Sequence, residues 1–303
     1  MKNPDNSPQT QSQTPALPQG FSTETLKTVA VVALLVLAFT NWNSVIGVMV
    51  NAMIFIYRIV GHNFGIAIIL FTILIRVVTW PLNAQQMKGA AAMQALQQDK
   101  EWIAIQKKYA KDKEKLAQEQ FRIQRERGVN MFGSCLPTLI QFPILFALIP
   151  TITYAIGSTP LSLLRLSSYV YEFQNVATLL PLKSNFLWMS DLGLPERTLL
   201  FGFSIPILAV IVGLTTFVQT KLTMPVSADP NDQAAQTSKM MGLYMPVMLF
   251  FFSLNYASGL AVYFITSNLL AIVQYAMMGK VNWRNLLPGG QNQDQKQIQK
   301  SKH

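Results

Sequence analysis

The chain has 303 residues, of which 50% are hydrophobic and only 13% are charged, and its formal net charge is +10. Soluble domains usually carry about 25% charged residues, so this composition indicates a membrane protein. A soluble nucleic-acid-binding protein would also be basic, but here the charge lies between and after long apolar runs. With one cysteine, Cys135, and two histidines, the chain is expected to have no intrachain disulfide, no metal site and no cofactor.

The start of the chain predicts a disordered segment followed by two helices. Residues 1–22 are rich in Pro, Gln and Ser, which predicts disorder. Residues 26–41 form a short apolar run that is either part of a cleaved signal or a retained anchor helix, and the lack of a clear small-residue cleavage site favours the anchor. Residues 43–60 include Asn51 and Arg58 and predict an amphipathic helix at the membrane interface.

Residues 64–83 form an almost unbroken apolar segment with one arginine, Arg76. About 20 apolar residues at roughly 1.5 Å each span a hydrocarbon core of about 30 Å, so the segment predicts a transmembrane helix. Arginine at the centre of such a helix costs about 2.5–3.5 kcal/mol, which makes Arg76 a candidate functional residue. Thr72, Thr79 and Asn83 share its face at helical spacing. The alternative is that Arg76 only extends toward the nearby polar end of the helix.

Residues 84–130 contain ten basic and six acidic residues and are rich in strong helix formers. They predict a water-exposed helical hairpin, with a solvated linker as the alternative. Apolar positions such as Met93 and Ile103 favour the hairpin, because they can form one packed face.

Residues 131–154 predict the next transmembrane helix. Ser134, Thr138 and Gln141 lie at helical spacing within it and form a second polar stripe. Two helices with matching polar stripes can enclose water, so this stripe and Arg76 together predict a polar groove inside the membrane.

The rest of the chain predicts three more spans. The predicted segments are an extracytoplasmic loop over 155–198, a span over 199–220, a cytoplasmic connection over 221–239, spans over 240–256 and 260–279, and a disordered cytoplasmic tail over 280–303. Lysines and arginines number 10, 2 and 5 in the hairpin, the connection and the tail, against 3 in the loop. The richer side is expected in the cytoplasm.

Enzyme motifs are absent from the sequence. It contains no P-loop, no H-E-x-x-H and no G-x-S-x-G. All acidic residues lie outside the predicted spans, which weakens the case for an ion-coupled transporter. The remaining hypothesis is non-enzymatic: a polar groove that eases the passage of polar polypeptide segments into the membrane. A solute channel or transporter is the alternative.

Five segments in order carry a family resemblance. They are NFGIAIILFTILIRVVTWPLNAQQ, MQALQ, GVNMFGSCLPTLIQFPILFAL, NFLWMSDLGLP and MPVMLFFFSLNYASGLAVYFITSNLLAIVQ. Over residues 42–280 the chain resembles the YidC/Oxa1/Alb3 membrane protein insertases. The resemblance implies an all-α polytopic protein of the bacterial inner membrane, with a five-helix core around a hydrophilic groove and a cytoplasmic C-terminus. It also implies that nascent membrane proteins enter the groove and leave sideways into the lipid.

The resemblance also assigns candidate site residues. Arg76 matches the groove arginine of the family, and Gln141 matches a polar residue of its second core helix. Thr72 matches a substrate contact, as does Tyr263 or Phe264. Ser267 belongs to the polar residues of the last helix.

The basic hairpin is the predicted contact for the ribosome, signal recognition machinery or a Sec translocon, because the basic tail is short. The candidate lysines are Lys107, Lys108, Lys111, Lys113 and Lys115. No sequence-specific nucleic-acid binding is expected. The chain departs from some relatives in having no large domain between residues 41 and 64, and its outer loop over 155–185 matches no family motif.

Overall fold

The computed structural model describes most of the chain from residue 40 onward. The described residues are 33, 36, 37, 40–110, 112–129, 146–154, 156, 160–171, 182–200, 203–223, 233–279 and 283. The chain divides into two units, Met1–Asn41 and Trp42–His303. Apart from residue 283, the predicted disordered segments lie outside the described residues, and so does most of the predicted anchor over 26–41.

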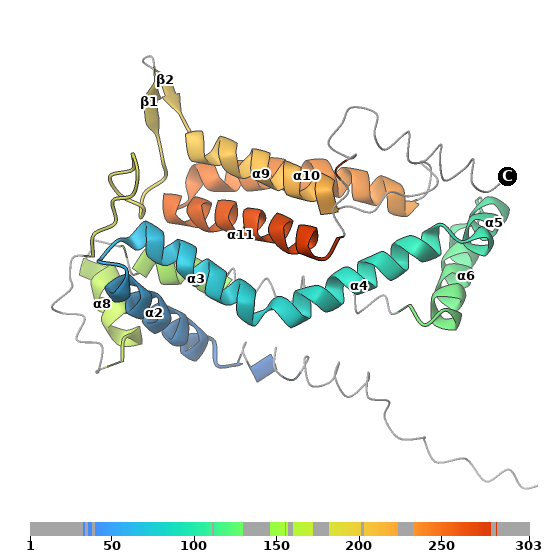
Figure 1. Cartoon of the computed structure of the whole chain (residues 1–303), viewed down its shortest axis with the longest axis horizontal. Coiled ribbons are helices and arrows are strands. Elements are labelled where there is room, and N and C mark those ends of the chain that lie inside the picture. The colour runs from blue at the N-terminus through green and yellow to red at the C-terminus, as the bar shows by residue number, and fades with distance from the viewer. Residues whose placement is uncertain are drawn as a thin grey trace, which may run out of the picture. The chain divides into compact units, whose positions relative to one another are not determined.

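Helices dominate the second unit (Figure 1). Its elements are α2 (Trp42–Ile59), α3 (Phe64–Val78), α4 (Trp80–Gln97), α5 (Lys100–Lys108), α6 (Lys113–Glu126), α8 (Pro160–Tyr169), β1 (Thr198–Leu200), β2 (Phe203–Ile205), α9 (Ile207–Thr223), α10 (Gln233–Asn255) and α11 (Ser258–Met277). Among the described residues, α2 and α11 are each long and apolar enough to cross a membrane, and α3 with α4 passes the same test as a bent pair. The prediction of an all-α polytopic membrane protein is confirmed, with one short β hairpin added.

Helix α11 packs against α3 and against α9, and α10 packs against α9 (Figure 1). Gly259 in the first turn of α11 permits a close approach, because a Cβ there would lie 3.0 Å from Ile68 Cδ1 and 3.1 Å from Ile152 Cγ2. Small residues at helix contacts are typical of membrane helices, whose backbones approach closely. Ile68 lies beside Gly259, and further along the two helices Arg76 bonds to Ser267. Helices α3 and α11 therefore run in the same direction.

The helix predicted over residues 64–83 is divided in the structure into α3 and the start of α4. Thr79 closes α3, and its N–H donates to two carbonyls of the last turn. Pro81 lies within the first two positions of α4. The N–H groups there have no acceptor inside the helix, so the missing N–H of proline costs no hydrogen bond. The proline therefore begins a new helix, and the axis bends by 58° at this break.

The span predicted over residues 199–220 also differs, because strands β1 and β2 pair before it and α9 begins only after Pro206. A proline next to a helix start is common, since its missing N–H costs nothing there. Glu196 Oε2 accepts a hydrogen bond of 3.0 Å from an N–H in the first turn of α9. Helix α10 instead begins seven residues before the span predicted over 240–256, so polar residues extend it.

Helix α2 matches the bounds of the predicted interfacial helix to within one residue at each end. One side joins the core with α3, and the other is exposed. Asn51 Nδ2 donates to the carbonyl of Tyr169 at 2.8 Å, and Asn51 Oδ1 accepts from the N–H of Tyr171 at 2.9 Å. The Tyr57 hydroxyl accepts from the N–H of Lys183 at 2.9 Å. Helix α2 thus holds two separate stretches that follow in the sequence, and its place at the interface stays a prediction.

The segment predicted as a hairpin over 84–130 contains α5, α6 and most of α4. A second apolar core holds its helices, made by Leu96, Trp102, Ile105 and Ile123. Asp99 and Asp112 cap α5 and α6 by accepting backbone N–H bonds of 2.9 and 3.1 Å. Gly128, at φ +66°, follows the end of α6 in the left-handed conformation that glycine favours.

Candidate functional site

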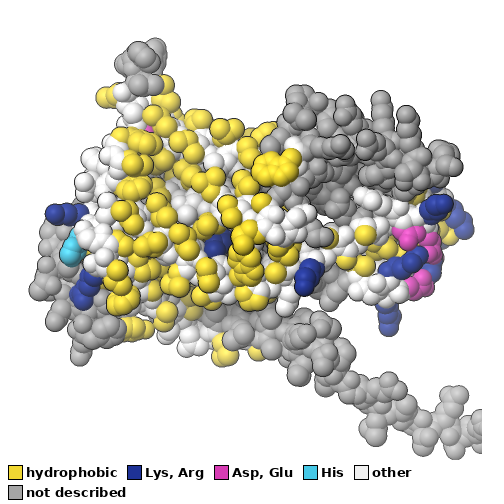
Figure 2. Space-filling model, in the orientation of Figure 1, with side chains coloured by type: hydrophobic (Ala, Val, Ile, Leu, Met, Phe, Trp, Pro, Cys, Tyr) yellow, Lys and Arg dark blue, Asp and Glu magenta, His cyan; other side chains and the backbone are white. Residues whose placement is uncertain are grey.

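Arg76 lies in the last turn of α3 and reaches across to α11. Its Nη2 atom donates to the backbone oxygen of Ser267 at 2.9 Å and to the Ser267 hydroxyl at 2.6 Å. Arg76 is the only basic residue in α3 and α11. Figure 2 shows a basic group surrounded by hydrophobic side chains between these two helices. A charged hydrogen-bonding site therefore lies inside an apolar face, and it is only partly buried.

The depth of this site follows from α11. Ser267 is the tenth of the 20 residues of α11, so it lies at the midpoint of a helix about 30 Å long. The Arg76 guanidinium is bonded to this midpoint and does not extend to the end of the span. Side-chain hydrogen bonds between membrane helices contribute about 0.6 kcal/mol on average and up to roughly 1.7 kcal/mol, so the two bonds offset much of the roughly 2.5–3.5 kcal/mol cost of the charge. Simple extension toward the interface is therefore not the conformation of Arg76.

The other predicted polar residues on this face bond within their own helices. Thr72 Oγ1 donates to Ile68 O at 2.6 Å, and Thr79 Oγ1 donates to Ile75 O at 2.8 Å. Asn83 Nδ2 donates to Thr79 Oγ1 at 3.3 Å and so continues the polar stripe across the bend into α4. Thr72 is only 1% exposed, whereas Thr79 and Asn83 are half-buried. In this conformation Thr79 and Asn83 are accessible and Thr72 is not.

Tyr263 and Phe264 are also buried. Tyr263 is 2% exposed, and its ring lies 5.5 Å from that of Phe264, which in turn lies 6.2 Å from Phe252 in α10. Tyr263 lies one turn before Ser267, just as Thr72 lies one turn before Arg76. Because α3 and α11 run in the same direction, Thr72 and Tyr263 belong to the layer next to the bonded pair. The predicted stripe of Ser134, Thr138 and Gln141 lies outside the described residues.

A second polar contact of α11 is not among the residues proposed from the sequence. Asn268 Nδ2 donates to Thr215 Oγ1 at 3.2 Å and to Thr216 Oγ1 at 2.8 Å, both in α9. Successive residues of a helix point about 100° apart, so Ser267 faces α3 while Asn268 faces α9. A serine and an asparagine in succession inside an apolar span are the signal that could have identified this contact.

Gln274 extends the polar face of α11 one step further. It lies seven residues after Ser267 and is buried, yet its Nε2 atom has no hydrogen-bond partner among the described residues. A buried donor without a partner costs roughly 1–3 kcal/mol, so Gln274 Nε2 can donate a hydrogen bond to an added acceptor group at little expense to the fold. Residues seven apart lie on one helix face, which places Gln274 on the side that Ser267 presents to α3.

The lysines proposed as partner contacts differ in their surroundings. Lys107 and Lys108 are exposed in the last turn of α5, and the Lys108 ammonium lies 5.1 Å from the centre of the Tyr109 ring. Lys115 forms an exposed ion pair with Asp112 at 3.5 Å. Lys111 and the side chain of Lys113 lie outside the described residues. Lys107 and Lys108 are therefore the better-placed contacts of this group.

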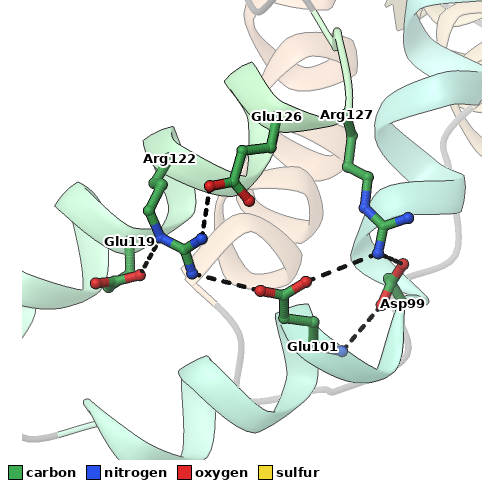
Figure 3. Close-up of polar contacts among 6 residues, drawn as sticks. All are labelled: Asp99, Glu101, Glu119, Arg122, Glu126 and Arg127. Atoms are coloured by element: carbon green, nitrogen blue, oxygen red, sulfur yellow. Dashed lines mark hydrogen bonds and ion pairs between the residues drawn. The ribbon is translucent and has the colours of Figure 1, made fainter.

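Two of the three hairpin arginines, Arg122 and Arg127, form ion pairs (Figure 3). The network consists of Asp99, Glu101, Glu119, Arg122, Glu126 and Arg127. Arg122 lies 2.7 Å from both Glu119 and Glu126 in α6, and 3.3 Å from Glu101 in α5. The hydrogen bonds to Glu119 and Glu126 raise the pKa of Arg122, so it stays charged. Because Arg122 and Arg127 are already neutralised by acidic side chains, the exposed Lys107, Lys108 and Arg125 carry much of the positive charge that the hairpin presents to solvent.

Within the described residues, no group of three or more His, Cys, Asp or Glu side chains is placed to hold a metal ion. The polar atoms of the site are a guanidinium, hydroxyls, amides and a backbone carbonyl. Such a site can donate and accept hydrogen bonds and can neutralise an anionic group. These groups suit the site to binding polar or anionic groups.

Comparison with known proteins gives a family match over most of the chain. The family model described as 60Kd inner membrane protein matches residues 55–284. The chain is 34% identical over 223 residues to a "Membrane protein insertase YidC" of Chlorobaculum tepidum, which covers 71% of this chain and 32% of that protein. It is 36% identical over 226 residues to a protein of the same name from Syntrophus aciditrophicus, which covers 75% of this chain and 34% of that protein.

The chain thus spans about a third of the length of these curated relatives. A solved structure described as "Active YidC insertase crystal structure with the first transmembrane domain resolved" is 26% identical, with a TM-score of 0.49, over 80% of this chain and 49% of that one. The family match covers most of the chain, from within α2 to beyond α11. The chain therefore belongs to the 60Kd inner membrane protein family.

Proposed function

We propose that this protein is a membrane protein insertase and chaperone. It receives nascent membrane proteins at the polar site of α3 and α11 and releases their hydrophobic segments sideways into the bilayer. The observation that carries the proposal is the bond between Arg76 and Ser267, which holds a charge at mid-depth in an apolar face and leaves it partly exposed. The names of the matching relatives support the same function.

The site lowers the cost of moving a polar segment into the membrane. A polar group without a partner costs several kcal/mol in hydrocarbon, so a carboxylate or peptide group of the substrate gains from a guanidinium and hydroxyls at that depth. Thr79 and Asn83 extend the polar path toward the charged hairpin. The exposed apolar side chains of α3, such as Val77 and Val78, lie beside it and offer a lateral exit into lipid. No covalent bond changes, so the activity is not enzymatic.

The remaining predicted residues take supporting roles. Thr72, Tyr263 and Phe264 are buried and stabilise the layer next to the bonded pair, so they contact substrate only if α3 and α11 separate. Ser134, Thr138 and Gln141 stay sequence-based candidates for lining the groove, and they lie outside the described residues.

The protein is placed in the bacterial inner membrane with its C-terminus in the cytoplasm, because the basic residues concentrate in the hairpin and the tail. The exposed lysines Lys107 and Lys108 then face the cytoplasm, where they meet the ribosome, signal recognition machinery or a Sec translocon. Paired arginines in the same hairpin keep its shape without competing for these partners.

Insertion of a single-span substrate with an acidic tail into vesicles that contain the purified protein tests the proposal. The double variant Arg76→Leu/Ser267→Ala removes the polarity of the site, and we expect it to lose most of the insertion activity. Thr266→Val is the matched control, because Thr266 is adjacent to Ser267 but bonds only to Val262 O in its own helix, at 2.8 Å. Full activity in the double variant, or solute flux through the vesicles in place of insertion, would contradict the proposal.

A further inference from the structure

A compact loop, residues 182–194, closes over the first turns of α3 and α11. We name it the capping loop. The N–H groups of Ser258 and Gly259 in α11 donate to the carbonyls of Leu194 and Leu192, both at 2.9 Å. Phe186 packs so closely on α3 that a Cβ at Gly65 would lie 2.1 Å from its ring. The capping loop is therefore fixed to the ends of two membrane helices.

The loop is also braced internally. Phe186 and Met189 exchange two backbone hydrogen bonds of 3.0 and 2.9 Å, which form a tight turn with Leu187 and Trp188 at its tip. Asp191 Oδ1 accepts from the Ser184 hydroxyl and from the N–H of Gly193, both at 2.8 Å. The position of the tip is thus set by these internal bonds together with the separate bonds that Leu192 and Leu194 accept from α11.

The tip presents its two largest apolar side chains outward. Met189 is buried, whereas Leu187 is 73% exposed and Trp188 is 49% exposed. Leu187 has a φ of +52°, in the left-handed region that non-glycine residues rarely adopt. Such strain persists where the surrounding structure holds it, and it is concentrated at functional positions. Leu187 and Trp188 together form an exposed apolar tip that is available to a partner outside the folded chain.

The attachment points place the tip at the boundary of the bilayer. Ser258 and Gly259 begin α11, a helix of membrane-spanning length, so a loop bonded to them lies at the depth where the span ends. Tryptophan is enriched at this depth because its ring is apolar and its N–H is polar. The indole N–H of Trp188 points toward Glu196 at 3.4 Å, which leaves the rest of the ring free. Lys183, at the start of the capping loop, and Arg197, just after it, are exposed and suit the phosphate groups of lipids.

We propose that the tip of the capping loop, Leu187 and Trp188, is a lipid-binding element that inserts into the interfacial layer of the bilayer where α3 and α11 begin. A protein partner fits less well, because two side chains bury at most about 400 Å², well below the roughly 800 Å² per partner of a stable protein interface. Since the loop is fixed to both helices, its insertion sets their depth and hence the depth of Arg76.

A fluorescent label at the tip tests this proposal. The label is the environment-sensitive dye NBD, attached to Leu187→Cys in the full chain with Cys135→Ser and reconstituted in phospholipid vesicles. The control carries the dye at Phe121→Cys, which is similarly exposed at 56% but lies in the charged hairpin helix α6. We expect blue-shifted emission at position 187, protection from iodide, and stronger quenching by nitroxides near the lipid headgroup than by nitroxides near the acyl chain end. The control should be quenched by iodide alone.

The same dye at Trp188→Cys must give the same pattern, which guards against a local effect of one substitution. The proposal is overturned if the tip label is as accessible to iodide as the control. It is also overturned if lipid nitroxides quench the tip no more than they quench the control, or if shielding appears only when a polypeptide substrate is added. The last result would identify a protein as the partner.

Discussion

The bond between Arg76 and Ser267 can be tested for two separate roles, one in the stability of the fold and one in the insertion of substrates. Replacing Arg76 with leucine removes the charge and both hydrogen bonds, while Ser267→Ala removes only the bond of 2.6 Å to the hydroxyl and leaves the backbone oxygen as an acceptor. If the arginine is present for substrates, the first variant should fold well and insert poorly. If it is present to hold α3 against α11, the first variant should be strongly destabilised.

The magnitudes follow from the geometry. Side-chain hydrogen bonds between membrane helices contribute about 0.6 kcal/mol on average and up to roughly 1.7 kcal/mol, so the two bonds of Arg76 together contribute about 1–3 kcal/mol. The charge itself costs about 2.5–3.5 kcal/mol at mid-depth. Because these terms nearly cancel, Arg76→Leu should change the free energy of unfolding by less than about 1 kcal/mol. Ser267→Ala should lower it by about 1 kcal/mol, since the charge stays and one bond is lost.

Thermal or denaturant unfolding of the purified protein in detergent, compared with insertion into vesicles, tests both statements. Thr266→Val serves again as the control, because its hydroxyl bonds within α11. A destabilisation of more than about 3 kcal/mol in Arg76→Leu would refute the reasoning and identify the arginine as a structural link. No change in either variant by either assay would mean that the bond makes no energetic contribution.

Three further outcomes are expected. Asn268→Leu should destabilise the protein by about 1–2 kcal/mol, because the hydroxyls of buried Thr216 and half-buried Thr215 in α9 lose a hydrogen-bond donor, and detergent unfolding measures this; an unchanged melting temperature would contradict the contact. Gly65→Ala should prevent the capping loop from closing, because its Cβ would lie 2.1 Å from the Phe186 ring, and limited proteolysis after residue 182 should then become rapid. Arg122→Gln should lower the melting temperature at low salt only, since about 1 M salt screens exposed pairs; an equal effect at high salt would exclude the ion-pair network as the cause.

The central residue of the site could be predicted from the sequence because a charge inside an apolar run is costly wherever it occurs. The predictions that Arg76 is functional and that Thr79 and Asn83 share its face depend on the local sequence pattern alone. The partner of Arg76 depends on which helix packs against α3 and in which direction, and several polar residues of the last span were equal candidates. Only the parallel packing of α3 and α11 selects Ser267.

The predicted and observed bounds of the helices differ for local reasons that the apolar pattern does not include. Residues 64–83 are apolar enough for one helix, but Pro81 starts a second. The sequence before α9 is as apolar as the span itself. Strands β1 and β2 nevertheless pair there, with Leu199 opposite Ser204. The burial of Thr72 and Tyr263 could not be predicted, because helical spacing gives the face of a residue and says nothing of what covers it.

The central claim is that substrate polypeptides contact the polar face around Arg76. The most direct measurement is site-directed photocrosslinking to a ribosome-bound single-span membrane protein, with the photoreactive residue at Thr79, which is half-buried on that face. The matched control is Leu214, which is exposed on α9. We predict crosslinks from position 79 that weaken when Arg76 is replaced by leucine, and none above background from position 214. Equal crosslinking from both positions, or none from position 79 during active insertion, would contradict the account.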